Sequence, residues 1–373
     1  MKIVLNGLQL KNQSSGIGIL IYHLFGEMIQ DSDEEFVTIL SKDSPEFPFD
    51  NQNSSQYRIP YRKRQSIKRN LYQTFRLGKE FCSDSVYLTI DSKVPLVMPN
   101  NCKILPIVTD LAAYRMKETY QLSRILFWKL QYRYLVKHAS HFVAISQCTK
   151  NDMTEILHIP EEKIDVIHSA ADKSFKRVTD RTILTLVKEK YGLTEQYLLF
   201  VGNLNPRKNL ERILLAFDLL KGTTALPHKM VIVGEYGWKF KKSKVLQKLK
   251  YRQDILFTDY VPATDMPSLY TMADLFVFST LYEGFGIPII EAQQCGTPVL
   301  TSKVSAMPEV GGQGAIYVDP YDIEDICNGM KRVLTEKDLA EDLSQKGYKN
   351  ALRFSWKAAA KKLNKIIEEL KKD

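Results

Sequence analysis

The chain has 373 residues, of which 44% are hydrophobic, 10% aromatic and 25% charged, and its formal net charge at pH 7 is +9. This length predicts two domains, the composition excludes collagen-like, coiled-coil and disordered chains, and no apolar run reaches the roughly 18 to 20 residues of a membrane-spanning helix. The five cysteines are scattered without a Cys-x-x-Cys pair, which argues against a disulfide framework or a zinc site and favours a reducing compartment.

Strand-like and helical runs alternate through the first half of the chain. The N-terminus begins with a strand rather than a charged leader and a long apolar region, so no signal peptide is expected. Apolar residues at three-and-four spacing predict helices over residues 17–28, 121–137 and 147–157, with Ser146 as the cap of the last. Short apolar strands between helices predict a parallel sheet covered on both faces. The expected strands are residues 2–6, 36–40, 86–90, 104–108, 141–144 and 164–167.

A basic segment, residues 58–79, carries most of the surplus charge. Apolar and aromatic residues at helical spacing from about Ile67 onward predict a basic amphipathic helix. Such a helix suits an anionic membrane surface, but a solvated face that covers part of its own domain explains the pattern equally well. Nucleic acid is not an expected partner, because no zinc-finger, RNP or helix-turn-helix pattern accompanies the charge. The cations are Arg58, Arg62, Lys63, Arg64, Lys68, Arg69, Arg76 and Lys79.

After a polar stretch around residues 171–181 the alternation begins again, which predicts a second doubly wound unit. Helices are expected over residues 210–220, 266–272, 287–295 and 323–335, and a last amphipathic helix over residues 356–370. Two parallel sheets that face each other place a ligand site at the carboxyl ends of their strands, in a cleft between the domains. The expected strands are residues 197–201, 229–233, 255–257, 274–278, 298–301 and 315–318.

The segment 273–299 is typical of a strand, a glycine loop and a helix. The loop holds Glu283 and the two glycines 284 and 286, and Pro288 lies in the first turn of the helix that follows. Free amides at a helix N-terminus suit a phosphate, and glycines let a ligand approach the backbone. Glu283 and Glu291 are candidate acceptors for sugar or ribose hydroxyls, although a glutamate that stabilises the helix start is the simpler alternative.

A second phosphate-type pattern covers residues 197–217. A strand ends at Val201 and Gly202, and Arg207 and Lys208 precede the next helix. An arginine fork and a lysine point charge suit a diphosphate. Alone, a basic pair at a helix start is weak evidence for a phosphate site, because its charge opposes the helix dipole. The strand that precedes the pair strengthens this interpretation.

Together these segments resemble glycosyltransferase family four, the retaining, nucleotide-sugar-dependent enzymes with the GT-B fold. Residues 283–299, EGFGIPIIEAQQCGTPV, look like the family's Glu, seven residues, Glu signature with its trailing Gly-Thr-Pro, and residues 206–209 look like the Pro-Arg-Lys-Asn of one large branch. Residues 16–18 resemble its N-terminal glycine loop, residues 142–146 its interdomain strand and helix, and residues 354–356 the start of its last helix.

The resemblance implies an α/β chain with three parts. These are an acceptor-binding Rossmann-like domain over residues 1–172, a donor-binding Rossmann-like domain over residues 173–352 and a helix over residues 353–373 that crosses back to the first domain. No metal or other cofactor is implied, because the nucleoside-diphosphate sugar is itself the substrate. The sole Asp-x-Asp, residues 31–33, lies in an acidic surface run, where metal binding is not expected.

The resemblance also implies residue roles. Arg207 and Lys208 would hold the donor diphosphate, Glu291 the ribose, and the backbone near Tyr260 and Val261 the base. Glu283 and the amides of residues 284–286 would hold the transferred sugar and its phosphate. The expected catalytic residues are Arg207, Lys208, Glu283 and Asp110, and the expected donor-binding residues are Gly16, Gly18, Gly202, Val261, Gly284, Phe285, Gly286 and Glu291.

Two positions depart from the family pattern. Many relatives have His before the aspartate at position 110, where this chain has Thr109. Many relatives outside this branch have Arg after the glycine at position 202, where this chain has Asn203. Arg207 is expected to take over the second role, while Thr109 leaves open how the first domain contacts the sugar.

The expected function is transfer of a hexose or deoxyhexose, such as mannose, rhamnose or glucose, from a nucleoside diphosphate to a glycan acceptor. A lipid-linked acceptor in cell-surface polysaccharide synthesis is favoured, at the inner face of the plasma membrane. A nucleotide-sugar epimerase with the same fold and an inactive binding subunit are the alternatives. An NAD-dependent oxidoreductase is less favoured, because residues 16–21 lack the third glycine of the dinucleotide fingerprint.

Overall fold

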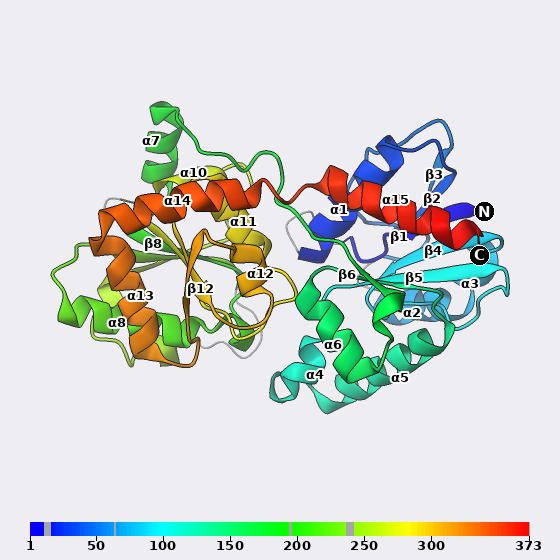
Figure 1. The fold of residues 1–373 in the computed structure, drawn as a ribbon, viewed down its shortest axis with the longest axis horizontal. Coiled ribbons are helices and arrows are strands. Elements are labelled where there is room, and N and C mark those ends of the chain that lie inside the picture. The colour runs from blue at the N-terminus through cyan, green and yellow to red at the C-terminus, as the bar shows by residue number, and fades with distance from the viewer. Residues whose placement is uncertain (11–15, 63–64, 194–195, 236–241, 373) are drawn as a thin grey trace. The chain divides into compact units, whose positions relative to one another are not determined.

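The computed structural model describes residues 1–10, 16–62, 65–193, 196–235 and 242–372, and the chain divides into two compact units (Figure 1). Unit 1 comprises Met1–Ser169 and Ser355–Asp373, and unit 2 comprises Ala170–Phe354. Each unit is built on its own parallel sheet, so the predicted α/β class is confirmed.

The sheet of unit 1 has the order β3-β2-β1-β4-β5-β6-β7, and every pairing is parallel. In β1, Ile3 pairs with Phe36 of β2 on one side and with Val86 of β4 on the other. The strands are β1 (Lys2–Asn6), β2 (Phe36–Ser41), β3 (Ser54–Ile59), β4 (Ser85–Ile90), β5 (Cys102–Val108), β6 (Phe142–Ala144) and β7 (Ile164–Val166). Six of them were expected from the sequence, and β3 is an additional edge strand.

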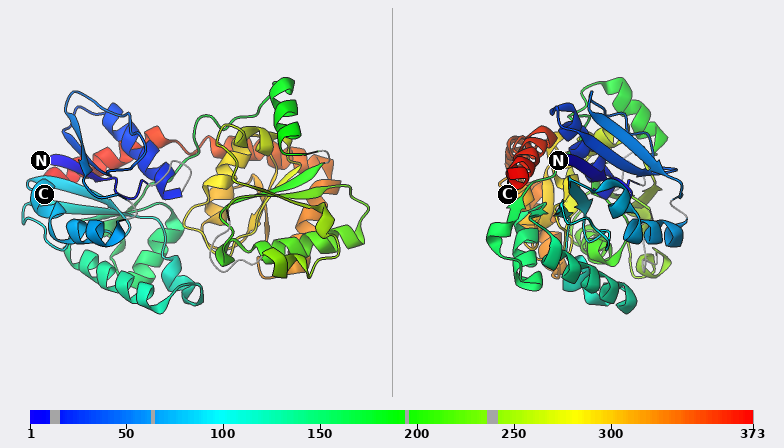
Figure 2. Two further views of the ribbon diagram at one scale, coloured as in Figure 1. Left: turned by 180° about the vertical axis from the view of Figure 1, so that it is seen from behind. Right: turned by 90° about the vertical axis from the view of Figure 1, so that its right-hand side faces the viewer.

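Helices cover both faces of this sheet. On one face α15 packs against α1, where the rings of His23 and Trp356 stack with centroids 5.6 Å apart. On the other face Tyr72 of α2, Leu77 of α3 and Tyr132 of α5 share a core with strand residues (Figures 1 and 2). The helices are α1 (Gly16–Gln30), α2 (Ser66–Phe75), α3 (Leu77–Phe81), α4 (Ala112–Arg115), α5 (Leu122–His138), α6 (Gln147–Leu157) and α15 (Trp356–Lys372), with short 3-10 turns at Lys117–Thr119 and Glu161–Lys163.

The sheet of unit 2 has the order β10-β9-β8-β11-β12-β13 and is also parallel throughout. Its inner strands are short apolar runs buried on both faces, as expected for a sheet between two helical layers, while the edge strand β10 is only partly buried. The strands are β8 (Tyr197–Val201), β9 (Lys229–Val233), β10 (Ile255–Asp259), β11 (Leu275–Phe278), β12 (Val299–Ser302) and β13 (Ala315–Val318).

Two helical layers enclose the sheet of unit 2. Phe217 of α8 and Met330 of α13 lie in the core on one face, while α10, α11, α12 and α14 pack with one another on the other. The helices are α7 (Arg181–Lys190), α8 (Leu210–Thr223), α9 (Lys242–Leu246), α10 (Met266–Met272), α11 (Ile287–Gln294), α12 (Met307–Gly311), α13 (Ile323–Thr335) and α14 (Lys337–Ala351), with 3-10 turns η3 (Pro206–Lys208) and η4 (Arg252–Asp254).

The predicted amphipathic helix of the basic segment is α2, but the residues on its buried and exposed sides differ from the prediction. Tyr72 is buried, as is Arg69, whose pKa is lowered by desolvation. Arg69 therefore belongs to the inner side of the helix and not to the exposed cations. Lys63 and Arg64 lie outside the described residues.

Candidate donor site

The order of the strands in unit 2 places two loops side by side. In an open parallel sheet a ligand binds where the strand order reverses, at the carboxyl ends of the strands. In unit 2 this switch point lies between β8 and β11. The loop after β8 carries Gly202, Arg207 and Lys208, and the loop after β11 carries residues 283–286. Both predicted phosphate-type segments therefore meet at one edge of one sheet.

The two cations contact the same carboxylate. Lys208 Nζ lies 2.9 Å from Oε1 of Glu283, and Arg207 Nη1 lies 3.6 Å from its Oε2. All three side chains are largely buried. Lys208 Nζ also lies 4.5 Å from the ring centroid of Phe278, which adds a cation–π contact. The site thus combines two positive charges and one negative charge with little solvent to screen them.

The Pro-Arg-Lys-Asn segment folds as the tight turn η3. The side chain of Asn205 accepts a hydrogen bond from the Arg207 amide at 3.1 Å and caps the turn, and Pro206 begins it. Asn209 ends the turn with a φ of 58°, and its amide group donates to the carbonyls of Ser279 and Pro320. These buried bonds fix the backbone that presents Arg207 and Lys208.

Two glycines of the site have backbone angles that side chains rarely adopt. Gly202 has a φ of 151°, and a Cβ there would lie 3.4 Å from Cε of Lys208. Gly286 has a φ of 115° and precedes α11, whose N-terminus carries no side-chain cap. A helix N-terminus without a side-chain cap has amides that suit an anion.

Ser305 holds the backbone of Glu283. Its hydroxyl donates to the Glu283 carbonyl at 2.5 Å, and the Glu283 amide donates to the Ser305 oxygen at 2.8 Å. Ser305 itself has a φ of 60°. No local sequence pattern marks Ser305, because its contact spans 22 residues and depends on a positive φ.

Glu291 lies inside α11 and is buried. Its Oε2 accepts a hydrogen bond from the Tyr270 hydroxyl at 2.8 Å. Burial raises the pKa of Glu291 to about 7, the nearby charge of Asp172 adds to this rise, and the bond from Tyr270 opposes it. Glu291 therefore gains and loses its charge near neutral pH. Tyr270 and Asp172 also belong to the surroundings of Glu291, and no sequence motif predicts either of them.

The remaining predicted residues are Val261 and Phe285 in unit 2 and three residues of unit 1. Val261 is buried just after β10, next to the exposed Tyr260. Phe285 packs edge-on against Phe354, with centroids 5.5 Å apart. Gly16 and Gly18 lie in the first turn of α1.

Asp110 follows β5 in unit 1. One of its carboxylate oxygens accepts a hydrogen bond from the Ala112 amide at the start of α4. Thr109, which stands where many relatives have His, donates from its amide and its hydroxyl to Oδ1 of Asp91, each at 2.8 Å. Burial, and secondarily the charge of Asp110, raise the pKa of Asp91 to about 6. Thr109 thus anchors a second carboxylate beside Asp110.

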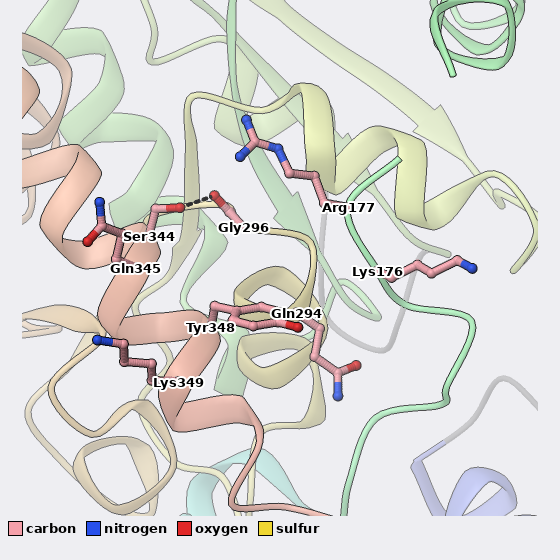
Figure 3. Close-up of a pocket in the computed structure, with 8 residues that line it drawn as sticks. All are labelled: Lys176, Arg177, Gln294, Gly296, Ser344, Gln345, Tyr348 and Lys349. Atoms are coloured by element: carbon pink, nitrogen blue, oxygen red, sulfur yellow. Dashed lines mark hydrogen bonds between the residues drawn. The ribbon is translucent and has the colours of Figure 1, made fainter. Parts of the chain in front are cut away.

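A cavity of about 530 Å³ lies elsewhere in unit 2, at the carboxyl end of α11 (Figure 3). None of the predicted site residues lines it. The lining residues are Lys176, Arg177, Gln294, Gly296, Ser344, Gln345, Tyr348 and Lys349. This cavity is therefore not the donor site that the sequence predicts.

The described residues hold neither a cluster of metal ligands nor a helix that could span a membrane. Among these residues, no group of three or more His, Cys, Asp or Glu side chains is placed to hold a metal ion. Asp31 of the Asp-x-Asp run pairs with Lys357 of α15 at 3.3 Å. Within the same described residues, no helix combines the length and the apolar content that a bilayer crossing requires.

Part of the chain is similar to known glycosyltransferases. Residues 186–350 match the family described as glycosyl transferases group 1. O-antigen chain mannosyltransferase B of Escherichia coli is 29% identical over 252 residues, which are 66% of this chain and 65% of that protein, just under two thirds of its length.

Solved structures support the fold over the whole chain. Sucrose-phosphate synthase from Thermosynechococcus elongatus has a TM-score of 0.77 at 17% identity, with 99% of both chains covered. Anabaena HepE in complex with UDP-glucose has a TM-score of 0.76 at 14% identity, with 99% of this chain and 100% of that chain covered. Residues 186–350 therefore match the group 1 glycosyltransferases, and the chain has the GT-B fold that its sequence predicts.

Proposed function

We propose that the protein transfers a hexose or deoxyhexose from a nucleoside-diphosphate sugar to a hydroxyl of a glycan acceptor. The observation that carries this proposal is the contact of Arg207 and Lys208 with Glu283 beside the N-terminus of α11. Two cations and a helix N-terminus at one sheet edge suit a diphosphate, and each charge-assisted bond contributes roughly 1.5 to 3 kcal/mol.

Donor binding would exchange partners within this cluster. A diphosphate that enters the site takes over the contacts of Arg207 and Lys208, and Glu283 then becomes available to accept hydrogen bonds from sugar hydroxyls. As the bond between the anomeric carbon and the phosphate oxygen breaks, the two cations stabilise the negative charge on the departing diphosphate. The proposal assigns this role to side chains and not to a metal ion or another cofactor.

The rest of the donor would be held around this centre. Glu291 in its charged form accepts from the ribose, the backbone at Val261 faces the base, and the amides of residues 284–286 contact the sugar phosphate. Gly16, Gly18 and Asp110, which belong to unit 1, remain predicted site residues.

The choice of substrates follows the relatives. Because the Escherichia coli relative is a mannosyltransferase of O-antigen chains, mannose is the first sugar to test and a polysaccharide intermediate the first acceptor. We place the reaction at the inner face of the plasma membrane, on a lipid-linked acceptor, with retention of the anomeric configuration. The basic segment 58–79 would face the lipid.

A donor panel tests the proposal. Thermal unfolding is measured with UDP-, GDP- and dTDP-sugars, since a ligand at a hundred times its dissociation constant stabilises a protein by about 2.7 kcal/mol. The donor that stabilises is then incubated with lipid-linked acceptor, and proton NMR reads the anomeric configuration of the product. A flat panel would support the inactive-subunit alternative, and epimerised donor without transfer would support the epimerase.

A further inference from the structure

The apolar side of α2 faces outward. Ile67, Leu71 and Phe75 recur every four residues on one side of the helix, and all three are exposed. The opposite side buries Tyr72 and the charged Arg69. A surface helix of a globular protein ordinarily turns its apolar side inward. In α2 this arrangement is inverted, so the helix does not simply cover its own domain with apolar residues.

Helix α5 exposes an apolar side as well. Its inner side contributes Ile125, Tyr132 and Leu135 to the core of unit 1. Four large apolar residues lie on its exposed side, namely Leu122, Leu126, Phe127 and Leu130. The sequence predicted this helix but assigned its apolar residues no function, because helical spacing alone does not distinguish a buried side from an exposed one.

The loop between β4 and β5 joins the two helices. The Leu96 amide donates to the carbonyl of Thr74 in α2 at 3.0 Å, and the Tyr134 hydroxyl of α5 donates to the carbonyl of Leu96 at 3.3 Å. Both helices lie on the same face of the unit 1 sheet (Figures 1 and 2). We name the exposed set the apolar ridge, and its members, each exposed over 47% to 75% of its surface, are Ile67, Leu71, Phe75, Leu96, Leu122, Leu126, Phe127 and Leu130.

Cations surround the apolar ridge. Helix α5 carries no acidic residue, and its four basic residues are exposed. Lys68 and Arg76 add exposed charge at α2 and just beyond its end. The nearby acidic Glu80 is engaged by the hydroxyl of Tyr72. The basic residues of α5 are Arg124, Lys129, Arg133 and Lys137.

We propose that the apolar ridge inserts into the surface of an anionic membrane, with α5 as an anchor that acts together with α2. Large apolar side chains on an exposed face mark an interaction surface, and a basic rim around them suits lipid headgroups that carry negative charge. A second copy of the chain fits this face less well, because two basic rims would repel each other. The inference extends the proposed function, since this surface is where a lipid-linked acceptor would be met.

Vesicle sedimentation of the full chain tests the anchor. Wild type should bind vesicles of equal parts phosphatidylglycerol and phosphatidylcholine, and the double variant Leu126→Ser/Phe127→Ser should lower the partition coefficient by about tenfold or more. The matched control is Ile183→Ser/Leu186→Ser, which changes two exposed apolar residues of α7 in unit 2 and should leave binding unchanged. Equal binding by the α5 variant and wild type would overturn the proposal.

The charge and the depth of insertion are tested separately. The double variant Lys129→Gln/Arg133→Gln should bind the mixed vesicles more weakly than wild type does. Wild type should in turn bind vesicles of pure phosphatidylcholine more weakly than the mixed vesicles. Equal affinity of wild type for the two kinds of vesicle would overturn the proposal of an anionic partner. Lipids with brominated chains should quench the fluorescence of Trp128 in α5, and Trp128→Phe should remove that part of the quenching. Absence of the Trp128 quenching would overturn insertion by α5.

Two further measurements separate this inference from competing outcomes. Sedimentation velocity without lipid should show that wild type is a monomer. If wild type is instead a dimer, and the double variant Leu126→Ser/Phe127→Ser is a monomer, then a second copy of the chain covers the apolar ridge and the proposal is overturned. Vesicle binding is measured without nucleotide, so its outcome is independent of the proposed catalysis. The double variant should also keep wild-type thermal stabilisation by the donor, since none of its changes lies in unit 2.

Discussion

Lys208 Nζ lies 2.9 Å from Oε1 of Glu283, although both side chains are about nine-tenths buried. Burial of an ion pair costs desolvation of both charges, and removal of one partner leaves the other uncompensated. When Lys208 is removed, Arg207 Nη1 still lies 3.6 Å from Oε2 of Glu283. The expected loss of folding free energy is therefore at the lower end of the range for breaking a buried ion pair.

We therefore expect Lys208→Met to lower the free energy of unfolding by roughly 3 kcal/mol. Glu283→Gln should also destabilise the protein, because it leaves two buried cations without their shared carboxylate. The double variant should lose less than the sum of the two single losses, which chemical denaturation of all four proteins measures. Strictly additive losses would show that the two charges do not stabilise each other.

The same lysine is expected to act in catalysis. Lys208→Ala should lower kcat by roughly a hundredfold or more, as loss of one preorganised donor to a developing charge typically does. The control is Lys221→Ala at the other end of α8, where a similarly buried lysine pairs with Asp254 at 3.1 Å. That variant should keep its kcat, measured at a temperature where both variants are folded. An unchanged kcat for Lys208→Ala would remove the proposed role.

The buried carboxyl of Glu291 makes stability depend on pH. Its pKa is raised from 4.5 to about 7, so the folded chain holds a proton that the unfolded chain releases. This contribution is complete below about pH 4.5 and is lost as the pH rises through 7. Relative to wild type, Glu291→Gln should gain stability across this window, by up to the order of 3 kcal/mol. Parallel curves of melting temperature against pH for the two proteins would contradict the assignment.

Gly286 is expected to tolerate no side chain. Its φ of 115° is unfavourable for alanine, and the new Cβ would lie 2.9 Å from Cε of Met307. Gly286→Ala should therefore destabilise the protein by roughly 1 to 3 kcal/mol. The control is Gly222→Ala within α8, where the new Cβ would lie 3.6 Å from the ring of Tyr251, an ordinary contact. This variant should be as stable as wild type or slightly more stable. Thermal unfolding without donor compares the two.

Transfer should persist without divalent metal. The proposal gives the charge on the leaving diphosphate to Arg207 and Lys208, so EDTA should leave the initial rate within about twofold of the untreated enzyme. Added Mg²⁺ should not rescue Lys208→Ala. A loss of activity in EDTA that Mg²⁺ restores would assign the leaving-group charge to a metal ion.

Much of the fold could be predicted because the strands are apolar runs with clear ends. The bounds of β8, β9 and β13 agree with the prediction to the residue, since polar residues or turns flank each run. The edge strand β3 escaped prediction, because four of its six residues are exposed and mostly polar. Helix α14 escaped as well, because its buried residues include Gly347 and Asn350, which carry no apolar pattern.

The site was predictable where its residues form compact motifs and not where tertiary contacts decide. Arg207, Lys208 and Glu283 each belong to a short segment whose position at a strand end follows from the pattern. The contact of Ser305 with Glu283 depends on a positive φ and a distant loop, and neither is visible locally. Likewise, the spacing of Ile67, Leu71 and Phe75 predicts a one-sided helix but not which side faces the core.

Helix α15 completes the α1 face of unit 1, although residues 170–354 of unit 2 separate it from the rest of that unit in the sequence. During synthesis, all residues of unit 2 are therefore made before the residues that finish unit 1. Until then α1 lacks the partner whose Trp356 stacks on His23, and the nascent chain exposes that apolar surface. The order of translation thus delays completion of unit 1 until the last residues of α15 have been added.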